Sequence, residues 1–389
     1  FYQFAEPLCQ HISKETGVPA DCIFITCTHT HTGPEVNLNR KILPEKQEAY
    51  FPFFCSRLTD AARFALQDLK PAKMGWGVGQ APGIAFVRRF RMKDGSTRTN
   101  PGINNPDVLA PIGDVDERVG VLRFDREGGE TIVLANIGIH PDTVGGCGIS
   151  GDWPAFTRRI LEKTIDNTRC VLLNGCQGDV NHVNTNPAPG QNNDLTMDFD
   201  DCMRGYGHAK HMGMTVAGAV MQVFSKVAYI PVESMTAMKR MLVHPSNMPK
   251  PEELPEAHRI NDLHKAGKDS ELPYEGMLLT TIVAEAERMV DLENGPEKFD
   301  LSMGALTLGD VALVGIPGEP FTAIGRAIKD APGWQLVMPM CCTNGYEGYF
   351  PTMDAYLEGG YEARSSIFKA GVAEAVAETA IDMLNDIRK

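Results

Sequence analysis

Residues 22–34 have the sequence Cys22-Ile23-Phe24-Ile25-Thr26-Cys27-Thr28-His29-Thr30-His31-Thr32-Gly33-Pro34. The apolar, β-branched start of this stretch predicts a buried strand, and the Gly-Pro pair predicts a turn after it. Because side chains two residues apart share one face of a strand, His29 and His31 are expected to lie together at the strand end. Two imidazoles on one face indicate a metal site or an acid–base pair, with two solvent-facing histidines as the alternative.

The rest of the chain alternates between strand and helix patterns. Helices are expected at about 44–69, 153–165, 205–229, 322–330 and 362–387, and strands at about 74–78, 84–86, 118–124, 131–139, 170–173, 306–315 and 335–340. Strands and helices that interleave with hairpins predict an α/β fold with a mixed β-sheet core flanked by helices. We expect a single domain over residues 1–389, with a helical insertion or lid at about 245–297.

Composition limits the classes of partner. The 389 residues carry a formal net charge of −13, which argues against nucleic acid because phosphate binding needs a basic surface. No apolar run is long enough for a transmembrane segment, and no targeting segment is visible. The ten cysteines form no CxxC pair, which favours reduced thiols and a cytoplasmic location. The expected partner is a small-molecule substrate, and a homo-oligomer stays open.

Two further polar residues follow apolar strands. His140 ends the run Asn136-Ile137-Gly138-Ile139 and is held extended by Pro141, so it is either a site residue or a strand-end histidine capped by solvent. Glu319 lies between Pro317 and Pro320, after a strand and before a helix. Its charge suits an ion or, alternatively, the helix N-terminus.

The loop of small residues at 174–182 follows another predicted strand. Backbone amides in such a loop can face an anion or oxyanion, so we expect substrate contacts from Gly175, Cys176 and Gln177. The Cys176 thiol could act as a nucleophile, but no activating base lies nearby in the sequence, and packing is the favoured role.

Two histidine pairs remain open in their interpretation. His182 with Asp179 could support or join a metal site, or could stabilise the loop. His208 and His211 lie three residues apart on a predicted helix and could bind zinc, although a solvated or partly buried helix face is favoured.

Several short segments, taken in order, resemble the catalytic domain of the neutral/alkaline (non-lysosomal) ceramidase family. Each segment is weak evidence alone, but their order along residues 28–362 is specific. They are Thr28–Pro34, Gly138–Thr143, Gly178–Val180, Pro317–Glu319, Asn344–Tyr349 and the pair Tyr361-Glu362.

The resemblance implies a zinc ion held by His29, His140, Glu319 and Tyr349. Two imidazoles, a carboxylate and a phenolate suit Zn²⁺ and leave a position for water. The resemblance also implies catalytic roles for His31, Arg88 and Tyr346, and a substrate contact for Asn344.

The chain departs from the family pattern in several places. Gly175, followed by Cys176, stands where the family has a serine, and the family's first strands and its C-terminal immunoglobulin-like domain have no counterpart. No apolar stripe marks an entrance for a long acyl chain. We therefore expect a ceramidase-like hydrolase that cleaves the amide bond of a smaller N-acyl compound by attack of zinc-bound water. The alternatives are an esterase, lactonase or sugar-cleaving hydrolase with the same zinc site, and a non-catalytic, metal-stabilised binding protein.

Overall fold

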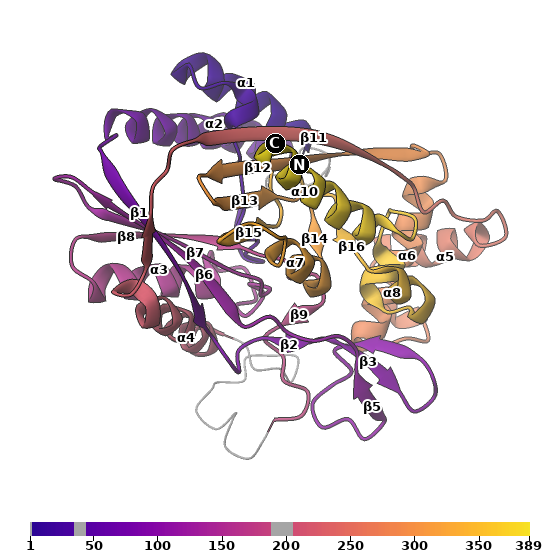
Figure 1. Cartoon of the computed structure of the whole chain (residues 1–389). Helices are drawn as coiled ribbons and strands as arrows, with labels where there is room; N and C mark the ends of the chain where they lie inside the picture. Colours follow the sequence, from indigo (N-terminus) through magenta and orange to yellow (C-terminus); the bar gives the residue numbers. More distant parts are fainter. Residues whose placement is uncertain (1, 35–43, 188–204) are drawn as a thin grey trace.

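The computed structural model describes residues 2–34, 44–187 and 205–389, and two sheets form its centre (Figure 1). The first sheet has the strand order β10-β1-β6-β7-β8, with β10 (Ala228–Ile230), β1 (Ala72–Gln80), β6 (Arg118–Arg126), β7 (Thr131–Ile137) and β8 (Thr168–Asn174). The second has the order β11-β12-β13-β15, with β11 (Met235–Pro245), β12 (Lys298–Leu308), β13 (Val311–Gly315) and β15 (Leu336–Met340). Both sheets are mixed, as the sequence predicts.

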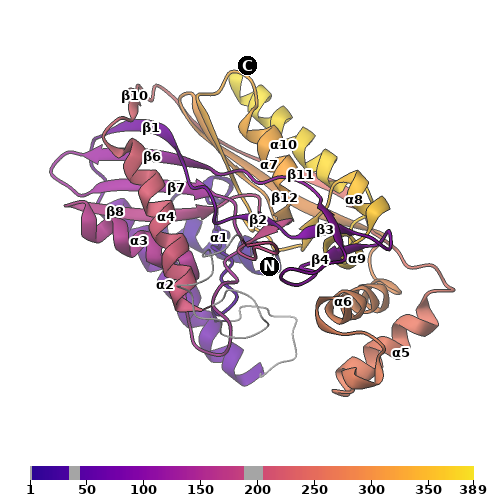
Figure 2. The same ribbon diagram turned by 90° about the horizontal axis from the view of Figure 1, so that it is seen from below.

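The two sheets pack face to face and are covered by helices on their outer sides (Figure 2). Leu122 and Leu173 of the first sheet share a buried cluster with Leu313 and Met338 of the second. The other face of the first sheet is covered by α3 (Asp152–Thr164) and α4 (Tyr206–Phe224), and that of the second by α7 (Thr322–Lys329) and α10 (Val372–Arg388). The result is a four-layer arrangement of helix, sheet, sheet and helix.

Each sheet contains one parallel pair, and these pairs determine where the site lies. β7 pairs with β8 in the first sheet, and β13 pairs with β15 in the second. Parallel strands bring their carboxyl ends to the same edge, where ligand sites of open sheets are found. Two short pairings add to this edge: β14 (Glu319–Pro320) with β16 (Tyr349–Phe350), and β2 (Phe86–Val87) with β9 (Val180–Asn181).

The remaining elements surround this frame. The helices α1 (Tyr2–Thr16) and α2 (Pro44–Gln67) pack together, partly through Phe4 against Phe51 and Phe54. A small three-stranded sheet has the order β4-β3-β5, with β4 (Thr97–Thr99), β3 (Arg89–Met92) and β5 (Val108–Pro111). The short helices are η1 (Ala20–Cys22), η2 (Asp269–Glu271), α8 (Met353–Glu358) and α9 (Tyr361–Ser365).

Residues 245–297 contain two α-helices, α5 (Leu254–Lys265) and α6 (Gly276–Leu292). The pair has a small apolar core of its own and projects to one side of the molecule (Figure 2). Glu285 on α6 forms an ion pair with Arg364 on α9. The two helices are thereby attached to the helix that carries Tyr361 and Glu362, and a lid role for them stays a prediction.

Three predicted elements differ in the structure. The strand predicted at 84–86 is replaced by the two-residue β2, which begins at Phe86. Residues 22–26 are not a strand, because the pairing there is limited to a single bridge between Thr26 and Thr343. Ile25 N donates to the side-chain Oδ1 of Asn344 at 2.7 Å, and Asn344 N donates to the carbonyl oxygen of Ile25 at 2.8 Å. The predicted helix 362–387 is divided into α9 and α10, because Ser246 and Phe368 form a bridge and hold the chain extended between the two helices.

Candidate metal centre

The segments that follow β7, β8, β13 and β15 meet at one edge of the two sheets. They carry His140, Gln177, Glu319 and Tyr349 in that order, and the loop after Thr26 brings His29 to the same place. The backbones approach closely there. A Cβ on Gly138 would lie 2.1 Å from the carbonyl oxygen of Cys176, so only glycine fits between the ends of β7 and β8.

Three histidines form a cluster that could hold a metal ion. One ligand atom of each of His29, His31 and His140 lies within 4.8 Å of the others. Their ring centres are 5.0, 5.2 and 5.6 Å apart. The predicted reason for this proximity is wrong, because His29 has a φ of 64° and is not in extended conformation. Left-handed backbone at a non-glycine residue is uncommon and marks a local constraint at this position.

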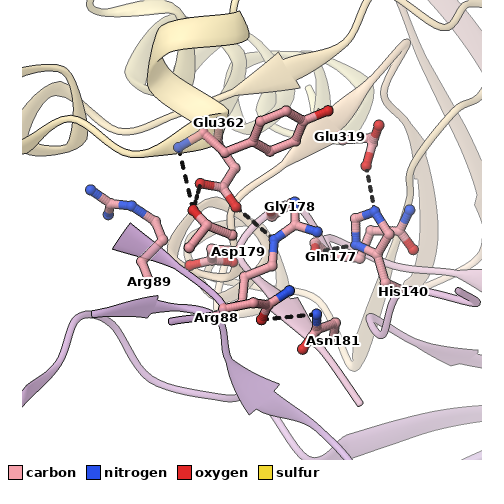
Figure 3. Close-up of polar contacts among 12 residues, drawn as sticks. Arg88, Arg89, His140, Gln177, Gly178, Asp179, Asn181, Glu319 and Glu362 are labelled. Carbon is pink, nitrogen blue, oxygen red and sulfur yellow. Dashed lines mark hydrogen bonds and ion pairs between the residues drawn. The ribbon is translucent and has the colours of Figure 1, made fainter. Parts of the chain in front are cut away.

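His140 is held in one orientation by its Nδ1 atom. Nδ1 lies 3.0 Å from the carbonyl oxygen of Gln177, which can only accept, so Nδ1 carries a proton and donates (Figure 3). Nε2 therefore faces the centre of the cluster, 2.9 Å from Glu319 Oε2. In a neutral imidazole, this places a lone pair against a carboxylate oxygen. A proton or a metal cation must lie between the two atoms for this contact to be favourable.

Glu319 is fully buried and depends on such a cation. Neither of its oxygens has a hydrogen-bond partner, and Oε2 also lies 3.4 Å from His29 Nε2. Burial alone would raise the pKa of Glu319, but the charges of His29 and His140 lower it well below its usual range. The carboxylate is thus ionised, and two imidazole nitrogens lie within 3.4 Å of its Oε2.

His31 and Tyr346 form the open side of the cluster. His31 is exposed on one side, and Tyr346 is 45% exposed with its ring centre 5.4 Å from that of His29. Partial burial lowers the pKa of His31 to about 4, so this imidazole is neutral near pH 7. A neutral imidazole beside solvent can accept a proton or bind a metal ion.

Tyr349 lies on the inner side of the cluster. Its ring centre is 6.4 Å from that of His140, and the register of β14 with β16 sets its backbone opposite Glu319. Burial and the Glu319 charge raise the pKa of Tyr349 well above its ordinary value, whereas Arg88 acts in the opposite direction. A phenolate here would therefore need both Arg88 and a metal cation.

Arg88 is buried beneath Tyr349, with its guanidinium carbon 5.3 Å from the ring centre. Its Nε donates to Glu362 Oε1 at 2.6 Å, and its Nη2 donates to the carbonyl oxygen of Gly178 at 2.7 Å (Figure 3). Thr99 donates to the second oxygen of Glu362. With two nitrogens occupied in this way, Arg88 is fixed toward Tyr349, while its predicted catalytic role stays a prediction.

Sequence reasoning assigned no role to Tyr361 or Glu362, although it singled out this pair as a segment. The Tyr361 ring centre is 5.6 Å from that of Tyr349, and Glu362 binds Arg88. The only signal was the resemblance, because nothing in the local sequence places Glu362 of α9 against Arg88, 274 positions earlier.

The residues predicted to contact substrate make packing contacts or hydrogen bonds within the protein. Cys176 is buried against Gly325 of α7, and burial raises the pKa of its thiol, which fits packing better than nucleophilic attack. Gln177 is fully buried and orients His140 through its carbonyl. Asn344 binds the backbone at residues 23 and 25, and Gly175 N donates to the carbonyl oxygen of Ile137. Their contacts with a substrate stay predictions.

Asp179 and His182 do not form the predicted pair. Asp179 accepts hydrogen bonds from the backbone and hydroxyl of Thr322 at 2.7 and 2.8 Å, and so caps α7. His182 instead lies 2.9 Å from Asp142.

Among the described helices, none is long and apolar enough to cross a membrane.

No family model and no curated protein matches the chain. Solved structures of ceramidases do match it, two of which follow. Neutral ceramidase from Pseudomonas aeruginosa has a TM-score of 0.71 at 16% identity, and the match covers 100% of this chain and 64% of that chain. A ceramidase complexed with C2 has a TM-score of 0.70 at 16% identity, and the match covers 100% and 66%, respectively. The chain spans less than two thirds of either, and it has a neutral-ceramidase-like α/β fold.

Proposed function

We propose that the protein is a zinc-dependent hydrolase that cleaves the amide bond of an N-acyl compound. The observation that carries the proposal is the contact between His140 Nε2 and Glu319 Oε2 at 2.9 Å, with Nδ1 of the same ring already used as a donor. Two buried acceptors at this separation fit a shared cation, and His29 supplies a third nitrogen. The fold of solved ceramidases supports the reaction class.

His29, His140, Glu319 and Tyr349 would hold the ion in this proposal. Zinc, when bound, supplies a Lewis acid and lowers the pKa of water toward about 7. Gln177 fixes the ligating tautomer of His140, as hydrogen-bonded carbonyls do for metal-binding histidines. Arg88 sits below Tyr349, where its charge favours the ionised phenol.

The open side of the cluster gives His31 and Tyr346 their roles. His31 is neutral and exposed, so it can accept a proton from water and pass it to the leaving amine. Tyr346 is protonated, because the Glu319 charge raises the pKa of Tyr346 well above its usual value. Its hydroxyl can donate to the carbonyl oxygen of the substrate.

The test is a panel of N-acyl amides, esters, lactones and glycosides, assayed with the full chain after chelation and again after zinc is restored. We expect amide hydrolysis that is lost on chelation and recovered with zinc. His31→Gln should lower kcat by about 10²- to 10⁴-fold and leave zinc content unchanged. His258→Gln, at an exposed position on α5, is the control and should have no effect. Hydrolysis restricted to esters or glycosides would reject the amidase assignment, and the absence of turnover on every class would favour a binding protein.

A further inference from the structure

A second pair of buried histidines lies apart from the His29 cluster, where the segment after β9 meets the first turn of α4. His182 is fully buried, and His208 is 4% exposed. Their ring centres are 5.4 Å apart. The proposed reaction uses neither imidazole.

The nitrogens of this pair lack partners. Asp142 Oδ1 lies 2.9 Å from His182 Nδ1, which makes Nδ1 the protonated donor and leaves a lone pair on Nε2. That Nε2 has no hydrogen-bond partner, and neither ring nitrogen of His208 has one. Buried polar atoms are nearly always satisfied, so three unpartnered ring nitrogens in one place indicate a missing ligand.

The spacing of the rings suits a metal ion. Two imidazoles that bind one tetrahedral ion at about 2.0–2.1 Å place their ring centres roughly 5 Å apart. The separation of 5.4 Å between His182 and His208 falls within the 5.0–5.6 Å found in the His29 cluster. A carboxylate that holds the far nitrogen of a histidine, as Asp142 does here, is typical of metal-binding histidines.

His211 supplies a third imidazole. It lies three residues after His208 on the same face of α4, with ring centres 6.1 Å apart, and its side chain is exposed. In the described part of the chain, only the His29 cluster already has three ligand atoms within 4.8 Å of one another. The second group therefore offers three ligand nitrogens to one ion only when the His211 side chain turns toward His208.

We infer that His182, His208 and His211 form a second site for a divalent transition-metal ion, with Asp142 as the residue that orients His182. An all-imidazole site suits zinc, copper, nickel or cobalt better than magnesium or calcium. A bound ion would connect the segment after β9 to α4.

The experiment counts metal ions in the full chain. The protein is stripped with a chelator, incubated with Co²⁺ alone, freed of unbound metal and analysed for cobalt per chain. We expect two ions in the unmodified protein and one in His208→Gln. His258→Gln, which changes an exposed histidine on α5, is the matched control and should keep both ions.

Glu319→Gln separates this inference from the proposed function. It should lose the ion at the His29 cluster and keep the one at His208. Two ions in Glu319→Gln with one in His208→Gln would reject the catalytic centre and leave the second site standing. Equal cobalt content in the unmodified protein and in His208→Gln would overturn the inference. If His208→Gln does not fold, His211→Gln at the exposed position decides. A Kd for one of the two ions that is at least about 10-fold higher than in the unmodified protein supports the site, and an unchanged Kd refutes it.

Discussion

Replacing Glu319 by glutamine tests whether Glu319 and His140 are two ligands of one metal ion or form a buried ion pair. Glutamine keeps the shape of the side chain but removes the charge. The carboxylate is fully buried, lies 2.9 Å from His140 Nε2, and has no hydrogen-bond donor on either oxygen. If a metal ion is the intended partner, the stability of the metal-free protein should not depend on this charge, because a buried carboxylate without donors is costly.

The expected magnitudes follow from the ligand count. A four-ligand zinc site is worth about 10–16 kcal/mol, so loss of one of four ligands should cost roughly 3 kcal/mol, or about 100-fold in Kd. Zinc at about 100 times the Kd of the unmodified protein stabilises it by about 2.7 kcal/mol, and the same zinc concentration stabilises the variant by only about 0.4 kcal/mol. With about 2.1 cal/mol/K of unfolding entropy per residue, the difference in Tm is roughly 3 °C for a chain of 389 residues.

The assay is thermal unfolding of both proteins, followed by circular dichroism in chelator and in zinc. We expect Glu319→Gln to be at least as stable as the unmodified protein in chelator and less stable in zinc. Glu256→Gln is the control, because its carboxylate is exposed and pairs only with Arg259 on the surface. A variant that is several degrees less stable in chelator, with an unchanged response to zinc, would refute the reasoning and show an ion pair between Glu319 and protonated His140.

Three more predictions follow from other parts of the structure. Cys176→Ala should keep hydrolysis within about 3-fold and lose about 1 kcal/mol of stability, whereas a folded, zinc-loaded and inactive variant would support a thiol mechanism. Glu362→Ala should destabilise the protein by about 3–5 kcal/mol in urea unfolding because Arg88 is left buried and unpaired, and Arg88→Met/Glu362→Met should recover most of this loss. Burial alone would raise the pKa of Asp116, but hydrogen bonds from Arg118 and the charge of Lys329 lower it from 3.8 to about 2. Since the folded-state pKa is depressed, Asp116 contributes about 2 kcal/mol above pH 3.8 and loses this contribution as the pH falls toward 2. Asp116→Asn should therefore be less stable at neutral pH, and its unfolding curve should approach that of the unmodified protein in acid; a difference independent of pH would contradict this.

The local sequence pattern was sufficient to predict most helices and strands and the types of side chain in the His29 cluster. The hairpin of β12 and β13 and the helix α4 occur where periodicity and turn residues predict them. His140 and Glu319 were singled out because each follows a short apolar run, and strand ends are where two parallel pairs bring side chains together. The distance between His140 and Glu319 could not be predicted from the local sequence, because it depends on how two separate sheets stack.

The failures share one physical cause, which is pairing over long sequence separation. The segment at 22–26 has the composition of a strand, yet its backbone is hydrogen-bonded by the side chain and the backbone N–H of Asn344, which no local rule anticipates. Glu362 contacts Arg88, which is far from it in the sequence, and His182 contacts Asp142 instead of its sequence neighbour Asp179. In each case, the tertiary fold supplies a better hydrogen-bond partner than the nearby chain does.

The arrangement of the two histidine groups also explains why Asp142 is aspartate in this chain. Two residues after His140, its carboxylate is buried, and burial alone would raise its pKa, but His182 and the two cluster histidines His140 and His31 hold the pKa of Asp142 well below its usual range. A permanent negative charge therefore lies between the two groups of imidazoles. It orients His182 through a direct contact and attracts cations toward both groups. A neutral residue at this position would leave His182 without an orienting partner, and the segment from His140 to Asp142 would then serve the first group alone.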